Sequence, residues 1–148
     1  MELVVLIGIP ATGKSTFARE RFGDTHLRLN LDMLRTRHRE DVLFRACLEA
    51  KQPVVIDNTN TTRAERARYL DPAKAAKFRV VGCYFSSKVA DALVRNASRT
   101  GDARIPEAAL LGMAGRLEAP RLDEGFDELR YVRLEPTGFV VEGWRDEV

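Results

Sequence analysis

The chain alternates short runs of consecutive apolar residues with longer segments in which apolar residues recur at helical spacing. The runs at residues 3–7, 53–56 and 78–85 lack the polar alternation of a half-exposed strand, so they predict strands that are buried on both faces. Strands that alternate with helices in this way predict an α/β fold with a mainly parallel sheet and helices on both faces. Further strands are predicted at residues 26–30, 129–134 and 139–144, and helices at residues 14–22, 41–50, from 62 to at least 69, 89–98 and 106–118.

A glycine-rich loop follows the first predicted strand and precedes the first predicted helix. Residues 8–15 read GIPATGKS and match the pattern G-x-x-x-x-G-K-[ST] in full. Gly8 and Gly13 allow a tight turn whose successive N–H groups form an anion site, and the following helix adds the positive end of its dipole. In such a P-loop, Lys14 bridges the β- and γ-phosphates of a nucleoside triphosphate, and Ser15 supplies a hydroxyl ligand to Mg²⁺. The motif therefore predicts a site for a nucleotide together with Mg²⁺.

A second polar motif comes directly after the strand at residues 53–56. Asp57 ends an apolar run, as does the acidic residue that organises Mg²⁺ in P-loop enzymes. Asn58 and Asn60 follow at the edge of the sheet where parallel strands present their ligands. The same stretch is also typical of a helix cap, because a threonine at 61 or 62 with Glu65 forms a capping-box pattern. Both roles are compatible, since the cap fixes the loop and the loop presents the two asparagines.

Asp32 and Arg35 form a charged pair three residues apart after the second predicted strand. On a short helix capped at residue 30 or 32 they share one face near the γ-phosphate edge. A carboxylate there can accept a proton from an attacking hydroxyl, and an arginine one turn later can hold an acceptor phosphate. A helix cap with a surface ion pair is the structural alternative.

Arg95 and Arg99 end another predicted helix, and a polar loop follows them. In a phosphotransferase, a basic lid over residues 95–106 would close on the nucleotide and neutralise charge on the transferred group. A solvated helix end is the alternative, because the helix dipole favours arginine there.

The composition of the chain contains no further motif, but it limits the kinds of site and the location that we expect. The net charge is only +2, but residues 123–148 carry eight acidic residues and three arginines, which leaves residues 1–122 clearly basic. The two cysteines and two histidines lack metal-ligand or redox-motif spacing, so we expect no site of that kind. No apolar run has membrane-spanning length and no signal-peptide pattern is present, so we expect a cytoplasmic protein. Without linkers or repeats, residues 1–148 are treated as a single kinase domain with an acidic C-terminal segment.

Five segments taken together resemble the kinase domain of the phage-type polynucleotide 5′-hydroxyl kinases. They are GIPATGKST at residues 8–16, NLDMLR at 30–35, VIDNTN at 55–60, RNASR at 95–99 and IP at 105–106. They occur in the family's order, and the resemblance implies a P-loop NTPase fold with a small arginine-bearing lid. The segment between Arg35 and Asp57 is shorter than in the phage enzyme, so part of the acceptor-site wall is missing or rebuilt.

The resemblance also implies a role for each matching residue. Asp32 would take the proton of a 5′-hydroxyl, and Arg35 would bind a phosphate of the acceptor. Ser15 and Asp57 would organise Mg²⁺, while Lys14 and the lid arginines hold ATP. The predicted catalytic residues are Lys14, Asp32 and Arg99; the nucleotide-binding residues are Gly8, Ala11, Thr12, Gly13, Lys14, Ser15, Thr16, Arg95 and Arg99; and the acceptor-binding residues are Arg35, Asn58 and Asn60.

These observations favour an ATP-dependent phosphotransferase that moves the γ-phosphate to a hydroxyl, above all the 5′-OH of a polynucleotide or nucleotide. A small-molecule kinase of the same fold is the alternative, acting on a sugar, nucleoside or antibiotic, and the short acceptor segment favours it. A nucleotide-binding switch with negligible turnover is a third possibility, against which the candidate base Asp32 and the basic lid argue. The absence of a guanine-reading N-K-x-D motif favours ATP.

Overall fold

A computed structural model describes residues 1–86 and 88–144, without the side chain of residue 102. In this part of the chain six strands form one sheet in the order β2-β3-β1-β4-β5-β6, with β6 alone antiparallel to its neighbour. The strands are β1 (Glu2–Ile7), β2 (Leu27–Leu29), β3 (Val54–Ile56), β4 (Arg79–Phe85), β5 (Glu128–Glu135) and β6 (Gly138–Gly143). The helices are α1 (Lys14–Phe22), α2 (Leu31–Leu34), α3 (Arg37–Ala50), α4 (Arg63–Ala75), α5 (Val89–Ala97) and α6 (Glu107–Arg116), with the 3₁₀ turns η1 (Gly101–Ala103) and η2 (Leu122–Glu124).

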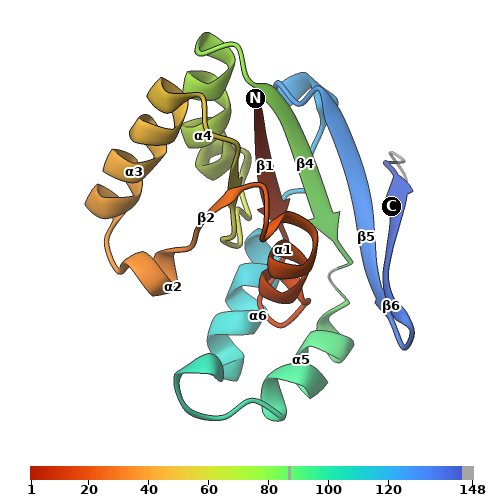
Figure 1. Cartoon of the computed structure of the whole chain (residues 1–148). Coiled ribbons are helices and arrows are strands. Elements are labelled where there is room, and N and C mark those ends of the chain that lie inside the picture. Colours follow the sequence, from red (N-terminus) through yellow and green to blue (C-terminus); the bar gives the residue numbers. More distant parts are fainter. Residues whose placement is uncertain (87, 145–148) are drawn as a thin grey trace.

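Strand β1 lies near the middle of the sheet and is buried on both faces, as its unbroken apolar run predicted. Val5 and its neighbours at alternate positions pack with α3 and α4, whereas Leu6 packs on the opposite face with Phe17 of α1. Figure 1 shows α3 and α4 together on one side of the sheet and α1 beside the end of β1. The predicted mainly parallel α/β sheet with helices on both faces is confirmed.

A third, smaller apolar cluster joins the P-loop to the helices of the predicted lid. Ile9 and Ala11 of the loop pack against Ala92 of α5 and Leu110 of α6, and all four are almost fully buried. In Figure 1, α5 and α6 lie beyond the ends of β1 and β4. The lid segment therefore emerges from helices that are already packed on the phosphate loop.

The structure corrects three local predictions. Helix α2 ends at Leu34, and Arg35 follows it with a φ of 78°, so Asp32 and Arg35 do not share a helical face. Helix α3 begins four residues earlier than predicted, because the hydroxyl of Thr36 accepts a hydrogen bond from the N–H of Arg39 and caps it. Pro106 precedes α6 as its cap instead of occupying its first turn.

Residues 123–144, the described part of the acidic C-terminal segment, fold back onto the body of the protein. The β5–β6 hairpin places the ring of Phe139 edge-on to Phe17, and Trp144 packs edge-on against Tyr84. Its carboxylates are largely paired with basic residues. These ion pairs join Asp123 to Arg63, Glu124 to Arg66, Asp127 to Lys74, Glu128 to Arg79 and Arg130, and Glu135 and Glu142 to Arg133. Among the described residues, no helix is long and apolar enough to cross a membrane.

Candidate nucleotide and metal site

Lys14 is folded into the P-loop that it ends. Its Nζ donates hydrogen bonds to the carbonyl oxygens of Gly8 at 2.9 Å and Ile9 at 2.7 Å. Burial lowers the pKa of this ammonium group to about 8; the nearby carboxylate of Asp57 raises it, and the charge of Arg99 lowers it further. An ammonium group held by two carbonyl oxygens and short of counter-charge is well suited to accept phosphate oxygens.

The backbone of the loop adopts conformations that few side chains tolerate. Gly13 has a φ of 92°, and a Cβ there would lie 3.0 Å from the ring of Phe139 on β6. Ala11 also has a positive φ, of 64°, which is unusual outside glycine and is often found where strain serves a site. The hydroxyl of Thr12 closes the turn by donating to the carbonyl of Ile9 at 2.9 Å. Thus the C-terminal hairpin and the loop's own bonds both hold the predicted phosphate cradle.

The two predicted metal ligands lie side by side. The hydroxyl of Ser15, at the start of α1, donates to Oδ2 of Asp57 at 2.8 Å, although the two residues are 42 positions apart. Asp57 directly follows β3, and its side chain is only 2% exposed. Mg²⁺ prefers oxygen ligands and usually keeps several waters, so it needs only one or two such groups from the protein. The pair fits that ion, and the described residues contain no larger cluster of acidic, histidine or cysteine side chains that could hold a metal.

Arg28, on the edge strand β2, also contacts this pair, although the sequence analysis did not select it. Its Nε donates to the same oxygen of Asp57 at 2.8 Å, and its Nη2 donates to Oγ of Ser15 at 3.3 Å. Leu29 points to the opposite face of the sheet, where it packs in the core below α3. The signal in the sequence was the alternation around residue 28, but only the parallel register of β2 on β3 brings this side chain to Asp57.

The helix that carries Asp32 is fixed by two hydrogen bonds to the residues that directly follow β3. Asn30 caps α2 by accepting from the N–H of Met33, and its amide donates to the carbonyl oxygen of Asp57 at 2.6 Å. The N–H of Leu31 donates to Oδ1 of Asn58 at 2.9 Å. Asp32 is exposed in this first turn, and its role as the base stays a prediction.

A buried carboxylate organises the wall behind this helix. Glu40 is fully buried and accepts hydrogen bonds from the hydroxyl of Tyr69 at 2.7 Å, the amide of Asn58 at 2.9 Å and the guanidinium of Arg37 at 3.0 Å. Burial, together with the hydrogen bond to Glu40, holds the pKa of Tyr69 well above its usual range. Both ends of the Asn58 amide are therefore occupied within the protein, by Leu31 on one side and Glu40 on the other.

Asn60 also serves the loop itself. It is 3% exposed with a φ of 49°, and its amide donates to the carbonyl of Leu6 at 2.7 Å. Just after it, the hydroxyl of Thr62 accepts from the N–H of Glu65 at 3.1 Å and caps α4, as predicted. The contacts give Asn58 and Asn60 structural partners, and their contact with an acceptor stays a prediction.

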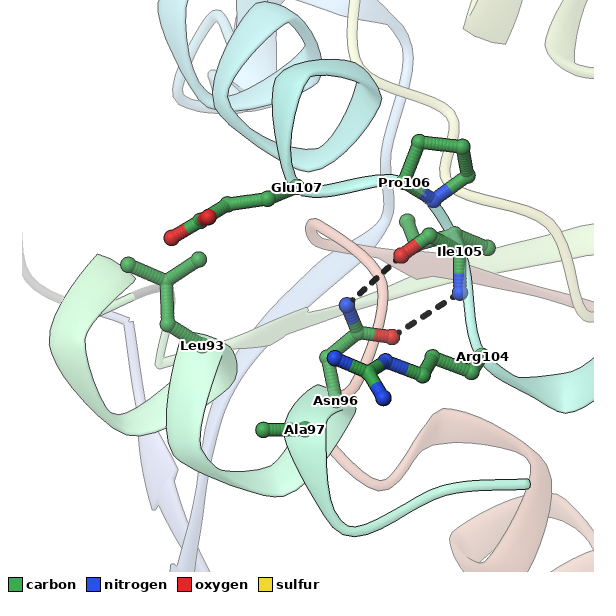
Figure 2. Close-up of a pocket in the computed structure, with 7 residues that line it drawn as sticks. All are labelled: Leu93, Asn96, Ala97, Arg104, Ile105, Pro106 and Glu107. Atoms are coloured by element: carbon green, nitrogen blue, oxygen red, sulfur yellow. Dashed lines mark hydrogen bonds between the residues drawn. The ribbon is translucent and has the colours of Figure 1, made fainter.

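The predicted lid is closed at its base by a buried asparagine. Figure 2 shows the amide of Asn96 paired with the backbone of Ile105: its Nδ2 donates to the carbonyl at 2.8 Å, and its Oδ1 accepts from the N–H at 3.0 Å. Arg95 reaches the P-loop and donates to the carbonyl of Ala11 at 3.4 Å. Arg99 donates to the carbonyl of Ala103 and is near enough to Lys14 to lower its pKa. A hollow of about 190 Å³ beside Asn96, lined by Leu93, Ala97, Arg104, Ile105, Pro106 and Glu107, is too small for a nucleotide.

The structure thus gathers the donor half of the predicted site. Lys14, Ser15 and Asp57 are in contact or in electrostatic reach, with Arg95 and Arg99 over the same loop. Thr16 is exposed on α1, and Arg35 is exposed beyond α2.

Comparison with known proteins agrees with this geometry. A family profile described as an AAA domain matches residues 3–120, which includes the P-loop, Asp57 and the lid. The chain belongs to this family of P-loop kinase domains. The match leaves residues 1–2 and 121–148 outside it, which include η2 and the β5–β6 hairpin.

Two curated relatives extend the comparison. The chain is 31% identical over 138 residues to a bifunctional polynucleotide phosphatase/kinase of Schizosaccharomyces pombe, covering 88% of this chain and 33% of that protein. It is 24% identical over 144 residues to an L-seryl-tRNA(Sec) kinase of Methanococcus maripaludis, covering 84% of this chain and 56% of that protein. The chain therefore spans about a third and about half of these relatives.

Solved structures share the fold. Kti12 of Chaetomium thermophilum in complex with ADP-AlF₃ superposes with a TM-score of 0.72 at 18% identity, covering 91% of this chain and 92% of that one. The Pnkp1/Rnl/Hen1 RNA repair complex matches with a TM-score of 0.60 at 25% identity, covering 78% of this chain and 43% of that one. The P-loop NTPase fold is established by these likenesses.

Proposed function

We propose that this chain is an ATP-dependent, Mg²⁺-dependent kinase that phosphorylates the 5′-hydroxyl of a nucleic acid. The observation that carries the proposal is the attachment of α2 to β3. The amide of Asn30 donates to the Asp57 carbonyl and the side chain of Asn58 accepts from the N–H of Leu31, so the start of the helix that carries the exposed Asp32 is fixed to the residues after β3. The fission-yeast relative, named as a polynucleotide phosphatase/kinase, supports the same acceptor class.

The chemistry follows from the positions of these groups. The acceptor oxygen attacks the γ-phosphorus of ATP, and a new P–O bond forms as the bond to the β-phosphate oxygen breaks. Asp32 takes the proton of the attacking hydroxyl. Lys14 and Arg99 offset negative charge on the phosphates, and Ser15 and Asp57 would hold Mg²⁺, which would supply further charge neutralisation. ADP and a 5′-phosphate leave the site.

The direct test supplies γ-labelled ATP and Mg²⁺ to a panel of acceptors. The panel contains 5′-OH DNA and RNA oligonucleotides, nucleosides, sugars and seryl-tRNA, the last because of the name of the archaeal relative. We expect label on the oligonucleotides, with a KM that rises with salt because the acceptor phosphates bind arginine. Label on a neutral metabolite alone, with no salt dependence, contradicts the proposal.

The role of Asp32 is tested with Asp32→Ala, which should abolish transfer while ADP affinity stays within a few-fold. Asp41→Ala is the matched control, because Asp41 is an exposed aspartate on the neighbouring helix α3. The control should keep full activity. Retained transfer in Asp32→Ala refutes the assignment of the base.

A further inference from the structure

Arg28 and a bound Mg²⁺ require the same two oxygen atoms. Oδ2 of Asp57 accepts from both Arg28 and Ser15, each at 2.8 Å, and Oγ of Ser15 accepts from Arg28 at 3.3 Å. A serine hydroxyl has one proton and two lone pairs; here the proton is given to Asp57 and a lone pair to Arg28. One lone pair of the Ser15 hydroxyl stays open to an ion, but the guanidinium places its positive charge against the same two oxygens, so the contact from Arg28 opposes metal binding there.

The position of Arg28 in the fold explains how it reaches these atoms. Arg28 is the middle residue of β2, an edge strand, and its Cα is in register with Val55 of β3. Val55 faces the α1 side of the sheet, and α1 begins with Lys14 and Ser15. The side chain is 25% exposed, whereas that of Asp57 is 2% exposed. Arg28 can therefore swing toward solvent, but the carboxylate cannot follow it.

We infer that Arg28 is an internal cation that competes with Mg²⁺ for Ser15 and Asp57 and so sets the Mg²⁺ concentration at which the site is loaded. With Arg28 in place, the charge of Asp57 is neutralised and a nucleotide can bind without metal. When Mg²⁺ binds, the guanidinium leaves these oxygens, since two cations within a few ångströms repel each other strongly. Arg28 thus acts through Asp57 and Ser15 as a positioning residue.

The inference predicts two changes of opposite sign in Arg28→Ala. The Mg²⁺ concentration that half-saturates the site should fall about fivefold or more, because the competing charge is gone. In EDTA, ADP should bind more weakly than to the wild type, because Asp57 is left as an uncompensated charge beside the phosphates. A side chain that only supports the fold, or one that only contacts phosphate, does not move these two constants in opposite directions.

The experiment titrates the full chain with a fluorescent ADP in EDTA, and then with MgCl₂ at fixed ADP. Arg79→Ala is the matched control: Arg79 begins strand β4, which β3 and β1 separate from β2, and it bonds Glu128 at 2.6 Å. It should leave both constants unchanged. Arg28→Gln, which keeps the length of the side chain but not its charge, should behave as Arg28→Ala and carries the test if the alanine variant does not fold.

An unchanged or higher Mg²⁺ requirement in Arg28→Ala or Arg28→Gln overturns the inference. It rests on the nucleotide site of the proposed function and not on the acceptor. If the wild type binds no ADP with or without Mg²⁺, the proposed kinase fails. If it binds ADP with a metal dependence that Arg28 does not alter, only the role of Arg28 fails.

Discussion

Arg66 and Arg28 both bind buried carboxylates, but in different surroundings. Arg66 of α4 and Glu124 of η2 form a bidentate pair, with Nε–Oε1 and Nη2–Oε2 distances of 2.8 Å and 2.9 Å. Arg28 of β2 reaches Asp57 through Nε alone, also at 2.8 Å. The two carboxylates are almost equally buried, but Arg66 is fully buried whereas Arg28 is a quarter exposed.

The remaining hydrogen bonds separate the two pairs further. Nη1 of Arg66 donates to the carbonyls of Asn60 and Glu118, each at 3.0 Å, so every nitrogen of this guanidinium is used. It joins α4 to the loop after β3 and to the segment before η2. Arg28 makes its second contact with the hydroxyl of Ser15, through Nη2. The other N–H groups of its guanidinium are free for solvent or phosphate. We call Arg66–Glu124 the closed pair, because all its nitrogens are bonded within the protein, and Arg28–Asp57 the open pair. The closed pair holds the fold together, whereas the open pair, beside the phosphate loop, can exchange its partner.

The largest expected effect is on stability, in Arg66→Met. The substitution leaves the Glu124 carboxylate buried without a cation, and breaking a buried pair in this way costs about 3–5 kcal/mol. We expect the Tm to fall by about 10 °C in a thermal melt of a chain of this size.

Arg63→Met is its control, because Arg63 lies three residues earlier on α4 and pairs with the exposed Asp123. Its Tm should stay close to that of the wild type, since exposed pairs contribute little. An equal loss of stability in the two variants would show that the closed geometry of Arg66 has no special value.

Asp57→Asn tests the open pair by removing the charge of its carboxylate. If the chain is the proposed kinase, the rate of transfer should fall about 10²–10³-fold, because the charge that would organise Mg²⁺ is lost. The Tm should change much less than in Arg66→Met, since Arg28 is exposed enough to find water. Kinetics and a thermal melt on the same preparation check both statements. A Tm loss as large as that of Arg66→Met would place the two pairs in one structural class.

The donor half of the site could be predicted from sequence because its signals are local. The P-loop is one continuous motif between a buried strand and a helix, and Asp57 is marked by the apolar run before it. Their meeting at 2.8 Å follows from the parallel pairing of β1 with β3, which puts both strand ends at one edge. The alternation of strands and helices was sufficient to predict that arrangement.

The supporting contacts could not be predicted in the same way, because they join distant positions. Glu40 meets Asn58 and Tyr69 across 18 and 29 residues, and nothing near Glu40 in the sequence indicates that it is buried. The contact of Arg28 with Asp57 depends on which face of the three-residue strand β2 turns toward α1. The helical pairing of Asp32 with Arg35 failed for a local reason, since the positive φ at Arg35 ends the helix.

A pH titration distinguishes the region of the open pair from that of the closed pair, because Lys14, near Asp57, titrates near neutrality. Burial lowers the pKa of Lys14 to about 8, and phosphate binding requires its charged form. In EDTA, we expect the Kd for ADP to rise about tenfold between pH 7 and pH 9, as the charged fraction falls. In the same protein, stability should rise between pH 8 and 10.5, where the unfolded chain binds a proton that the folded chain has released.

Lys14→Met is the control for this titration. It should bind ADP weakly at every pH and show no rise in Kd from pH 7 to 9. If the Kd of the wild type for ADP is also constant from pH 7 to 9, Lys14 keeps its proton in the folded protein. The region of the open pair is then no more sensitive to pH than that of the closed pair.

The smallest predicted effect compares the two pairs by the same substitution, arginine to lysine. An ammonium group keeps the charge but cannot make two parallel bonds to a carboxylate, so the cost depends on how many guanidinium nitrogens are engaged. Arg66 engages all three, and Arg66→Lys should lose about 1 kcal/mol, or roughly 2–4 °C in Tm. Arg28→Lys loses a single strong hydrogen bond beside solvent, so its Tm should equal that of the wild type. Equal melting of both variants would mean that charge alone, and not the closed geometry, makes Arg66 structural.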